Sequence, residues 1–182
     1  MVYMFLAEGF EECEALIPLD ILRRANIETK TVGVTGKSVC GSHNIEIVCD
    51  EQIENIKFSS EISAIILPGG MPGTLNLKAN KKLEDMILAA NDKGIIIAAI
   101  CAAPLILGNL RLLENKNAIC YPGFENELKG AKISENNVAK DGNIITAKGV
   151  GAAFDFGFEI LNALTNEAEK TDSLKKTMIY GE

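Results

Sequence analysis

The feature that most constrains the fold is an unbroken run of small and apolar residues from Gly94 to Ile100, followed at once by Cys101. Such a run is typical of a parallel strand that is buried on both faces of a sheet. After Cys101 the pattern becomes helical, and Pro104 falls in the first helical turn, where a missing N–H is tolerated. The sequence therefore predicts a sharp strand-to-helix corner that carries Cys101.

Further strands and helices alternate along the chain. Apolar segments predict strands at residues 3–7, 28–34, 45–48, 62–67 and 117–121, and Asp141-Gly142-Asn143 signals a hairpin between residues 138–140 and 144–146. Helical spacing predicts helices at about residues 14–25, with Pro18 in the first turn or so, from Leu83 to Ala90, and finally from Phe154 to Leu164. The tail after Asn166 is polar and weakly periodic. This alternation is typical of an α/β fold with a mostly parallel sheet covered on both faces.

Length and composition narrow the class of protein. A chain of 182 residues suggests one domain over residues 1–182, and a net charge of −7 argues against a nucleic-acid surface as the main function. We expect no membrane span and no signal peptide, since no apolar run is long enough and no basic flank precedes the first strand. Five cysteines without a CxxC pair and a single histidine argue against a metal site or a disulfide scaffold. Reduced thiols favour a cytoplasmic location.

The corner that carries Cys101 suggests a reactive thiol. A thiol beside free backbone N–H groups at the positive end of a helix is expected to favour the thiolate. The N–H of Ala102 and that of Gly70, in a Gly69-Gly70 turn after another buried strand, are candidates for an oxyanion hole. Buried cysteines are more often inert packing residues, and paired glycines are more often a plain tight turn, so these alternatives remain open.

Three carboxylates crowd the start of the first predicted helix. Compensation of the helix dipole is a sufficient explanation for Glu11 and Glu12. Glu14 is a candidate acid/base if its side chain points inward. A carboxyl held against a thiolate would have a raised pKa and could move a proton near neutral pH.

Several motifs in order give the chain a resemblance to the ThiJ/PfpI superfamily, and within it to the branch that contains the parkinsonism-associated protein deglycase. The resemblance spans nearly the whole chain. Its motifs are Ala7-Glu8-Gly9-Phe10-Glu11-Glu12-Cys13-Glu14, Ile17-Pro18-Leu19-Asp20, Arg23-Arg24-Ala25, Leu67-Pro68-Gly69-Gly70, Ala98-Ala99-Ile100-Cys101-Ala102-Ala103-Pro104, Ser134-Glu135-Asn136, Lys140-Asp141-Gly142 and Gly149-Val150-Gly151.

The resemblance implies a fold, an assembly and a reaction. The fold is a flavodoxin-like three-layer sandwich with a nucleophile-elbow cysteine, assembled as a homodimer. The site would pair Cys101 with a protonated Glu14, with Gly70 and Ala102 as backbone donors. The reaction would convert a small 2-oxoaldehyde to a hydroxy acid through a hemithioacetal on Cys101, as in glutathione-independent glyoxalases and deglycases, without a cofactor.

The chain departs from the superfamily near the cysteine. Where many members carry a histidine, this chain has Tyr121, whose hydroxyl could bind a substrate oxygen or whose ring could simply pack. The single histidine, His43, lies in a segment where relatives tend to carry an arginine near the dimer interface. Protease chemistry therefore loses its base. The principal alternative to an enzyme is an oxidative-stress sensor or chaperone-like protein in which Cys101 oxidises to a sulfinate.

Overall fold

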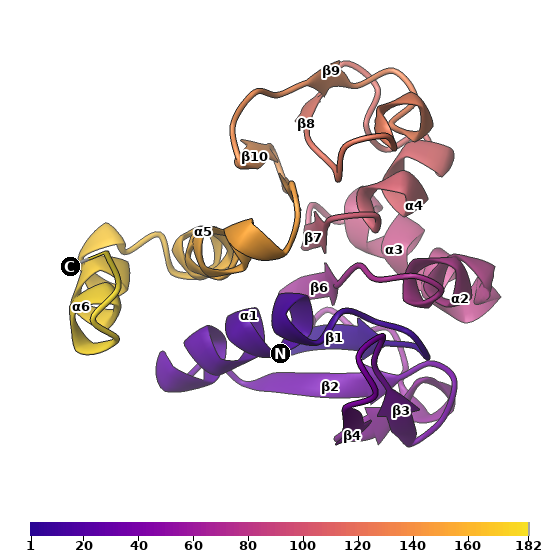
Figure 1. The fold of residues 1–182 in the computed structure, drawn as a ribbon, viewed down its shortest axis with the longest axis horizontal. Coiled ribbons are helices and arrows are strands. Elements are labelled where there is room, and N and C mark those ends of the chain that lie inside the picture. The colour runs from indigo at the N-terminus through magenta and orange to yellow at the C-terminus, as the bar shows by residue number, and fades with distance from the viewer. Residues whose placement is uncertain (182) are drawn as a thin grey trace.

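A seven-stranded sheet forms the centre of the molecule in a computed structural model that describes residues 1–181 (Figure 1). The strand order is β10-β11-β7-β6-β1-β2-β5. Neighbouring strands run parallel except for the hairpin of β10 and β11, which is antiparallel, as its Asp-Gly-Asn turn predicts. The strands are β1 (Val2–Leu6), β2 (Thr29–Gly33), β5 (Glu51–Gln52), β6 (Ala64–Leu67), β7 (Ile96–Ile100), β10 (Val138–Asp141) and β11 (Ile144–Ala147).

Helices cover both faces of this sheet. One face carries α1 (Glu12–Arg24) and α5 (Ala153–Thr165), which pack against each other, and the other carries α2 (Gly73–Ala79), α3 (Lys81–Asp92) and α4 (Pro104–Asn109) (Figure 1). Alternate residues of the strands point to opposite faces: Met4 belongs to the core under α1 and α5, whereas Phe5 belongs to the core under α3 and α4. The predicted three-layer α/β sandwich is thus confirmed. Among residues 1–181, no helix combines the length and the apolar character needed to cross the hydrocarbon core of a bilayer.

Several short elements lie outside the central sheet. β3 (Ser38–Cys40) pairs with β4 (Glu46–Val48), and β8 (Asn117–Ala118) pairs with β9 (Lys132–Ile133). The strand predicted at residues 117–121 is therefore shorter than expected and does not join the main sheet. Short 3₁₀ turns complete the chain at η1 (Ile53–Asn55), η2 (Glu125–Glu127) and η3 (Val150–Ala152).

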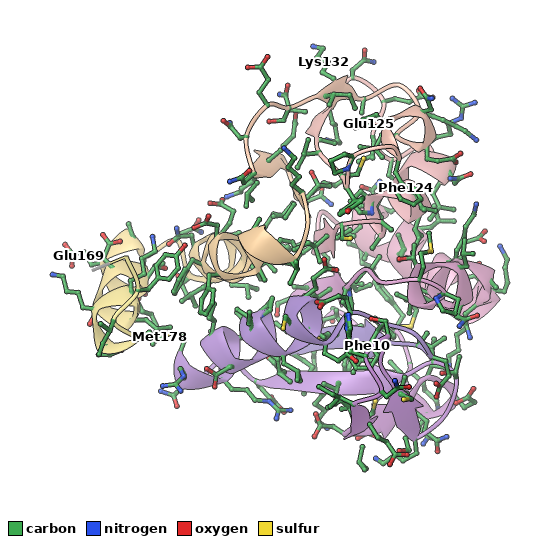
Figure 2. All side chains as sticks on the ribbon, viewed as in Figure 1. Phe10, Phe124, Glu125, Lys132, Glu169 and Met178 are labelled. Atoms are coloured by element: carbon green, nitrogen blue, oxygen red, sulfur yellow. The ribbon has the colours of Figure 1, made fainter. Side chains whose placement is uncertain are left out.

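A further helix, α6 (Ala168–Thr177), follows α5 where no regular element was predicted. Figure 2 shows Glu169 and Met178 at this peripheral end of the molecule, whereas Phe10 lies within its body and is completely buried. Helix α6 is held by the segment after it, because Tyr180 stacks on Phe154 and its hydroxyl donates to Asp155 at 2.7 Å. These contacts come from outside α6, so the weak periodicity of its own sequence gave no sign of it.

The position of Pro18 differs from the prediction. Helix α1 begins at Glu12, so Pro18 stands in the helix interior and cannot donate to the carbonyl of Glu14. Helix α5 lies close to α1 at this point. A Cβ placed on Gly157 of α5 would lie 3.1 Å from the Cα of Pro18 and 2.6 Å from the side chain of Ile21. Close tertiary packing therefore supports a helix that its own residues would interrupt.

Candidate active site

Cys101 lies at the apex of the predicted corner. β7 ends at Ile100 and α4 begins at Pro104, and Cys101 between them has a left-handed backbone with φ of +64°. Such a conformation is rare for a residue with a side chain and recurs at functional sites. The backbone of Cys101 is fixed on both sides: its N–H donates to the carbonyl of Ala147 at 2.9 Å, and its carbonyl accepts from the N–H of Tyr121 at 2.8 Å. The side chain is partly exposed, so a small reagent can reach it.

Glu14 points inward and meets the thiol. The residue is only 1% exposed, and its carboxyl lies close enough to the side chain of Cys101 for each group to act on the pKa of the other. Its Oε2 accepts the N–H of Gly69 at 3.0 Å, and its own N–H donates to the carboxylate of Glu11 at 2.6 Å. Glu11 is thus the N-cap of α1, while Glu14 is buried and turned toward Cys101. The spacing of the three carboxylates could not establish whether Glu14 points inward. In the structure it does.

Two glycines let the backbone approach this pair. A Cβ on Gly69 would lie 2.6 Å from the carboxylate of Glu14 and 2.7 Å from the Cβ of Cys101, so a side chain there would displace one of them. Gly70 has φ of +89°, which favours glycine. The backbone N–H groups of Gly70 and Ala102 lie near the sulfur of Cys101 and act to lower the pKa of its thiol. The predicted donors therefore converge on the thiol.

The proton balance of the pair differs from the prediction for an isolated corner thiol. Burial raises the pKa of Glu14 to about 7. Burial and the negative charge of Glu14 raise the pKa of Cys101 to about 12, against the lowering effect of the N–H groups of Gly70 and Ala102. The expectation that the corner alone favours a thiolate is therefore wrong, because it left out the carboxylate beside the sulfur. Between these two values the pair shares one proton, and the thiolate exists only while that proton is on Glu14.

Tyr121 and the segment after β11 form a hollow beside the corner. Tyr121 is 51% exposed, and its ring lies against Gly149, where a Cβ would come within 3.3 Å of the ring. The hollow has a volume of about 390 Å³. It is lined by Tyr121, Pro122, Asn137, Lys148, Gly149, Val150, Gly151 and Ala152.

Apart from Tyr121, the residues lining this hollow were not among the predicted site residues. Lys148 follows the end of β11, and sites in parallel sheets gather where strands end. Applying the same rule to the end of β11 would have added Lys148 to the predicted site residues.

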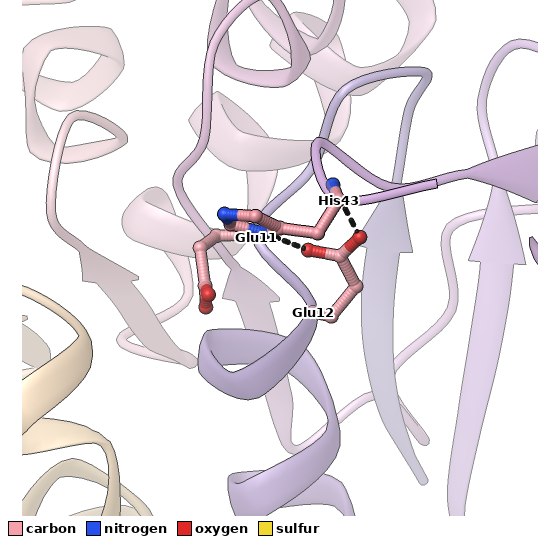
Figure 3. Close-up of side chains that lie close together, drawn as sticks. All are labelled: Glu11, Glu12 and His43. Carbon is pink, nitrogen blue, oxygen red and sulfur yellow. Dashed lines mark hydrogen bonds and ion pairs between the residues drawn. The ribbon is translucent and has the colours of Figure 1, made fainter. Parts of the chain in front are cut away.

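The single histidine is bound to the start of α1, and within residues 1–181 the structure gives it no hydrogen bond to Cys101. Its Nδ1 is 2.8 Å from Oε2 of the buried Glu12, and its backbone N–H donates to Oε1 at 2.7 Å (Figure 3). Glu11, Glu12 and His43 place one ligand atom each within 4.8 Å of one another, a spacing that a metal ion would also fit. Hydrogen bonds account for this cluster, since Glu11 caps α1 and Glu12 accepts from His43 and Ser42. His43 is therefore a partner of the helix start and not a base for Cys101.

This contact predicts the titration of His43. Its hydrogen bond to the Glu12 carboxylate raises the pKa of His43 above 6.5 and lowers that of Glu12. The contribution of the His43–Glu12 ion pair to the stability of the folded state is therefore complete below pH 6.5. It is lost as the pH rises through the folded pKa of His43. As the only histidine, His43 gives one set of imidazole resonances in an NMR titration, and we expect their midpoint above 6.5. Glu12→Gln should bring it back to about 6.5; a midpoint at or below 6.5 in the unmodified protein would contradict the contact.

The arrangement around Cys101 has the parts needed for nucleophilic addition to a carbonyl group. A partly exposed sulfur is the nucleophile, and the N–H groups of Gly70 and Ala102 lie beside it, so they are available as donors to an oxyanion formed there. Glu14, with its pKa near neutrality, is suited to give and take a proton there.

Comparison with known proteins gives a consistent assignment. The DJ-1/PfpI family model matches residues 1–163. Protein dj-1beta of Drosophila melanogaster is 31% identical over 179 residues, which cover 97% of this chain and 95% of the relative. A cysteine-to-alanine mutant of a DJ-1 superfamily protein from Salmonella typhimurium superimposes with a TM-score of 0.94 at 30% identity, covering 100% of this chain and 98% of the other. An oxidised DJ-1 of Toxoplasma gondii superimposes with a TM-score of 0.91 at 29% identity, covering 100% and 98%.

Proposed function

The chain belongs to the DJ-1/PfpI family, and from this membership and the geometry around Cys101 we propose that it converts reactive 2-oxoaldehydes to 2-hydroxy acids without glutathione. The observation that carries the proposal is that the buried Glu14 carboxyl and the Cys101 side chain lie together at Gly69, beside the N–H groups of Gly70 and Ala102. A thiol alone would support many roles. A thiol that shares a proton with a buried carboxyl supports chemistry in which a proton must move between neighbouring carbons.

The first step is addition to the aldehyde. With the shared proton on Glu14, the Cys101 thiolate forms a C–S bond to the aldehyde carbon of methylglyoxal, and the carbonyl electron pair moves to oxygen. The N–H groups of Gly70 and Ala102 stabilise this oxyanion. Glu14 then protonates it, which gives a neutral hemithioacetal and a Glu14 carboxylate.

The second step moves a proton between two carbons. The Glu14 carboxylate removes the proton from the former aldehyde carbon, which gives an enediolate. The hydroxyl proton on the first oxygen passes to the second oxygen, and Glu14 returns a proton to the former ketone carbon. The aldehyde carbon is thereby oxidised and the ketone carbon reduced, so no external oxidant or cofactor is required. The product is a lactoyl thioester on Cys101. Water hydrolyses this thioester to lactate and restores the thiolate.

Tyr121 occupies the place near the thiol where the superfamily often has histidine. Its backbone N–H is bound to Cys101, and its exposed ring lines the adjoining hollow, which supports a role in binding substrate. Its hydroxyl can donate to a substrate oxygen. In this proposal Glu14 alone carries the proton transfers.

The test is lactate formation from methylglyoxal by the purified protein without glutathione, run in D₂O and followed by NMR. We expect turnover, with deuterium at C2 of lactate, because the proton held by Glu14 exchanges with solvent before it returns to carbon. Turnover with complete retention of the original proton would contradict this role of Glu14. No turnover would overturn the proposed enzyme.

A second candidate function is oxidation sensing at the same cysteine. The oxidised Toxoplasma gondii relative and the partial exposure of Cys101 favour it. Two molecules of hydrogen peroxide would each transfer one oxygen to the sulfur and leave as water, giving a sulfinate that the same N–H groups would bind. The two functions separate by turnover, since a sensor would gain two oxygens at Cys101 under peroxide and yet form no lactate.

We propose further that the protein forms a homodimer through the face of α1. A groove of about 530 Å³ runs along α1 and is lined chiefly by apolar side chains, among them Leu16, Ile17, Ile45, Phe154 and Met178. Val48 and Ile179 remain 71% and 70% exposed. An apolar surface of this kind in a chain of net charge −7 favours burial against a second copy. The five unpaired cysteines support the accompanying proposal of a cytoplasmic location.

Sedimentation equilibrium checks the dimer. The protein should sediment with twice the chain mass of 19.6 kDa, and Leu16→Glu should shift it to the monomer, because the charge would be buried at the interface. Leu75→Glu, at an exposed position on α2, is the matched control and should stay dimeric. A monomeric unmodified protein at about 100 μM would refute the proposed dimer.

A further inference from the structure

The hollow between Tyr121 and residues 148–152 is joined directly to the backbone of Cys101. Cys101 accepts the N–H of Tyr121 at one wall, and donates to Ala147, the residue before Lys148, at the other. Lys148 is itself anchored, because its N–H donates to the carbonyl of Asn137 at 2.9 Å. The walls of the hollow are therefore held in a fixed relation to the sulfur. Cys101 is not among the lining residues, so a substrate bonded to its sulfur would reach this space of about 390 Å³ with the part of the molecule that does not react.

Among residues 1–181, the only charge that lines this hollow is positive. The chain has 25 acidic and 18 basic side chains, yet Lys148 is the one ionised residue in the lining. Lys116 is paired with Asp141 and Lys140 with Glu159, whereas the structure gives Lys148, like Lys129 and Lys132, no such pair within residues 1–181. The nearby carboxylate of Glu125 accepts the N–H of Gly123 at 2.8 Å and does not line the hollow.

The polar groups beside Lys148 are also suited to an anion. Asn137 contributes an amide and Tyr121 a hydroxyl, and both can donate hydrogen bonds. Pro122, Val150 and Ala152 supply apolar walls that would hold a short carbon chain. An ammonium group, two further donors and an apolar wall together match a carboxylate at the end of an aliphatic chain.

We propose that this hollow binds an anionic group of the substrate, so that the preferred substrates are 2-oxoaldehydes that end in a carboxylate or a similar anion. The proposal rests on the proposed function for its aldehyde end, while the anionic subsite itself is independent of turnover. Lys148 would act as a specificity residue: it would not take part in bond making but would attract and orient the charged end of the molecule.

The first experiment measures the subsite without turnover. Iodoacetate and iodoacetamide alkylate Cys101 by the same displacement of iodide and differ in charge, and peptide mass spectrometry reads the rate at Cys101 alone. The ratio of the iodoacetate rate to the iodoacetamide rate should fall about threefold in Lys148→Gln. It should be kept in Lys148→Arg and in Lys93→Gln, which removes the same charge just after α3, before β7 begins and so at the other end of that strand from Cys101. High salt should lower the ratio in the unmodified protein. An unchanged ratio in Lys148→Gln overturns the proposal.

The second experiment measures the same preference in catalysis. 4,5-Dioxopentanoate is a 2-oxoaldehyde that ends in a carboxylate, and its primary amide is a neutral control of the same shape. The ratio of their kcat/KM values should fall in Lys148→Gln and stay unchanged in Lys93→Gln. Turnover of both compounds with no dependence on Lys148 would overturn the subsite and leave the proposed function intact. No turnover of either compound, with a charge-dependent alkylation ratio, would overturn the proposed function and support the subsite.

Discussion

Replacing Cys101 by alanine should lower kcat/KM for methylglyoxal by at least about 10³-fold, to the level of the reaction in buffer. The reason is that the C–S bond of the hemithioacetal cannot form, and no other thiol can take its place. Cys120 and Cys49 are buried, so the aldehyde does not reach them, and Cys13 in α1 and Cys40 in β3 lie outside the corner that brings together Glu14, Gly70 and Ala102. The measurement is the initial rate of lactate formation at saturating and at low methylglyoxal.

The fold should tolerate this substitution. The backbone at position 101 has φ of +64°, and alanine in that conformation is no more strained than cysteine. Thermal unfolding should therefore show a change within a few degrees, which separates lost chemistry from lost structure. Cys40→Ala is the matched control: it removes a partly exposed thiol from β3 and should keep full activity. Retention of most activity by Cys101→Ala would contradict the mechanism.

The sequence predicts the central layers of this fold well because each is recorded in a local pattern. The apolar run before Cys101 became β7, buried on both faces, and the Asp-Gly-Asn turn became the hairpin of β10 and β11. Elements that depend on distant contacts were less predictable. Helix α6 is held by contacts of Tyr180, and the helix around the interior Pro18 is supported by the close approach of α5. Neither contact has a signal in the local sequence.

The candidate site shows the same division. Strand ends predicted that Cys101, Gly69 and Gly70 would meet, and they do. The inward turn of Glu14 could not be read from three successive carboxylates, since it depends on Glu11 and not Glu14 capping the helix. The proton balance was beyond the sequence for a related reason. It is set by burial and by the distance between two groups from different elements, and helix position alone predicted the wrong direction for the thiol.

Glu14→Gln should separate the catalytic value of Glu14 from its effect on stability. The amide keeps the shape of the carboxyl and can still accept the N–H of Gly69 and donate to the sulfur, but it cannot take a proton from carbon. We expect kcat for methylglyoxal to fall about 10²- to 10⁴-fold, the usual range for loss of a general acid/base. Alkylation of Cys101 should continue, which would show that the nucleophile remains in place.

The same variant should be more stable than the unmodified protein at pH 8. The pKa of Glu14 is raised from 4.5 to about 7, so the folded state binds more protons than the unfolded state between these values. The free energy of unfolding should therefore fall as the pH rises through this window, by on the order of 3 kcal/mol. Glu14→Gln lacks this dependence, so the difference between the two proteins isolates Glu14 from His43 and other titrating groups. Urea unfolding at pH 4.5, 6 and 8 measures the difference; if it stays constant across the three values, Glu14 is ionised without cost, and its role as a proton carrier near neutral pH loses its physical basis.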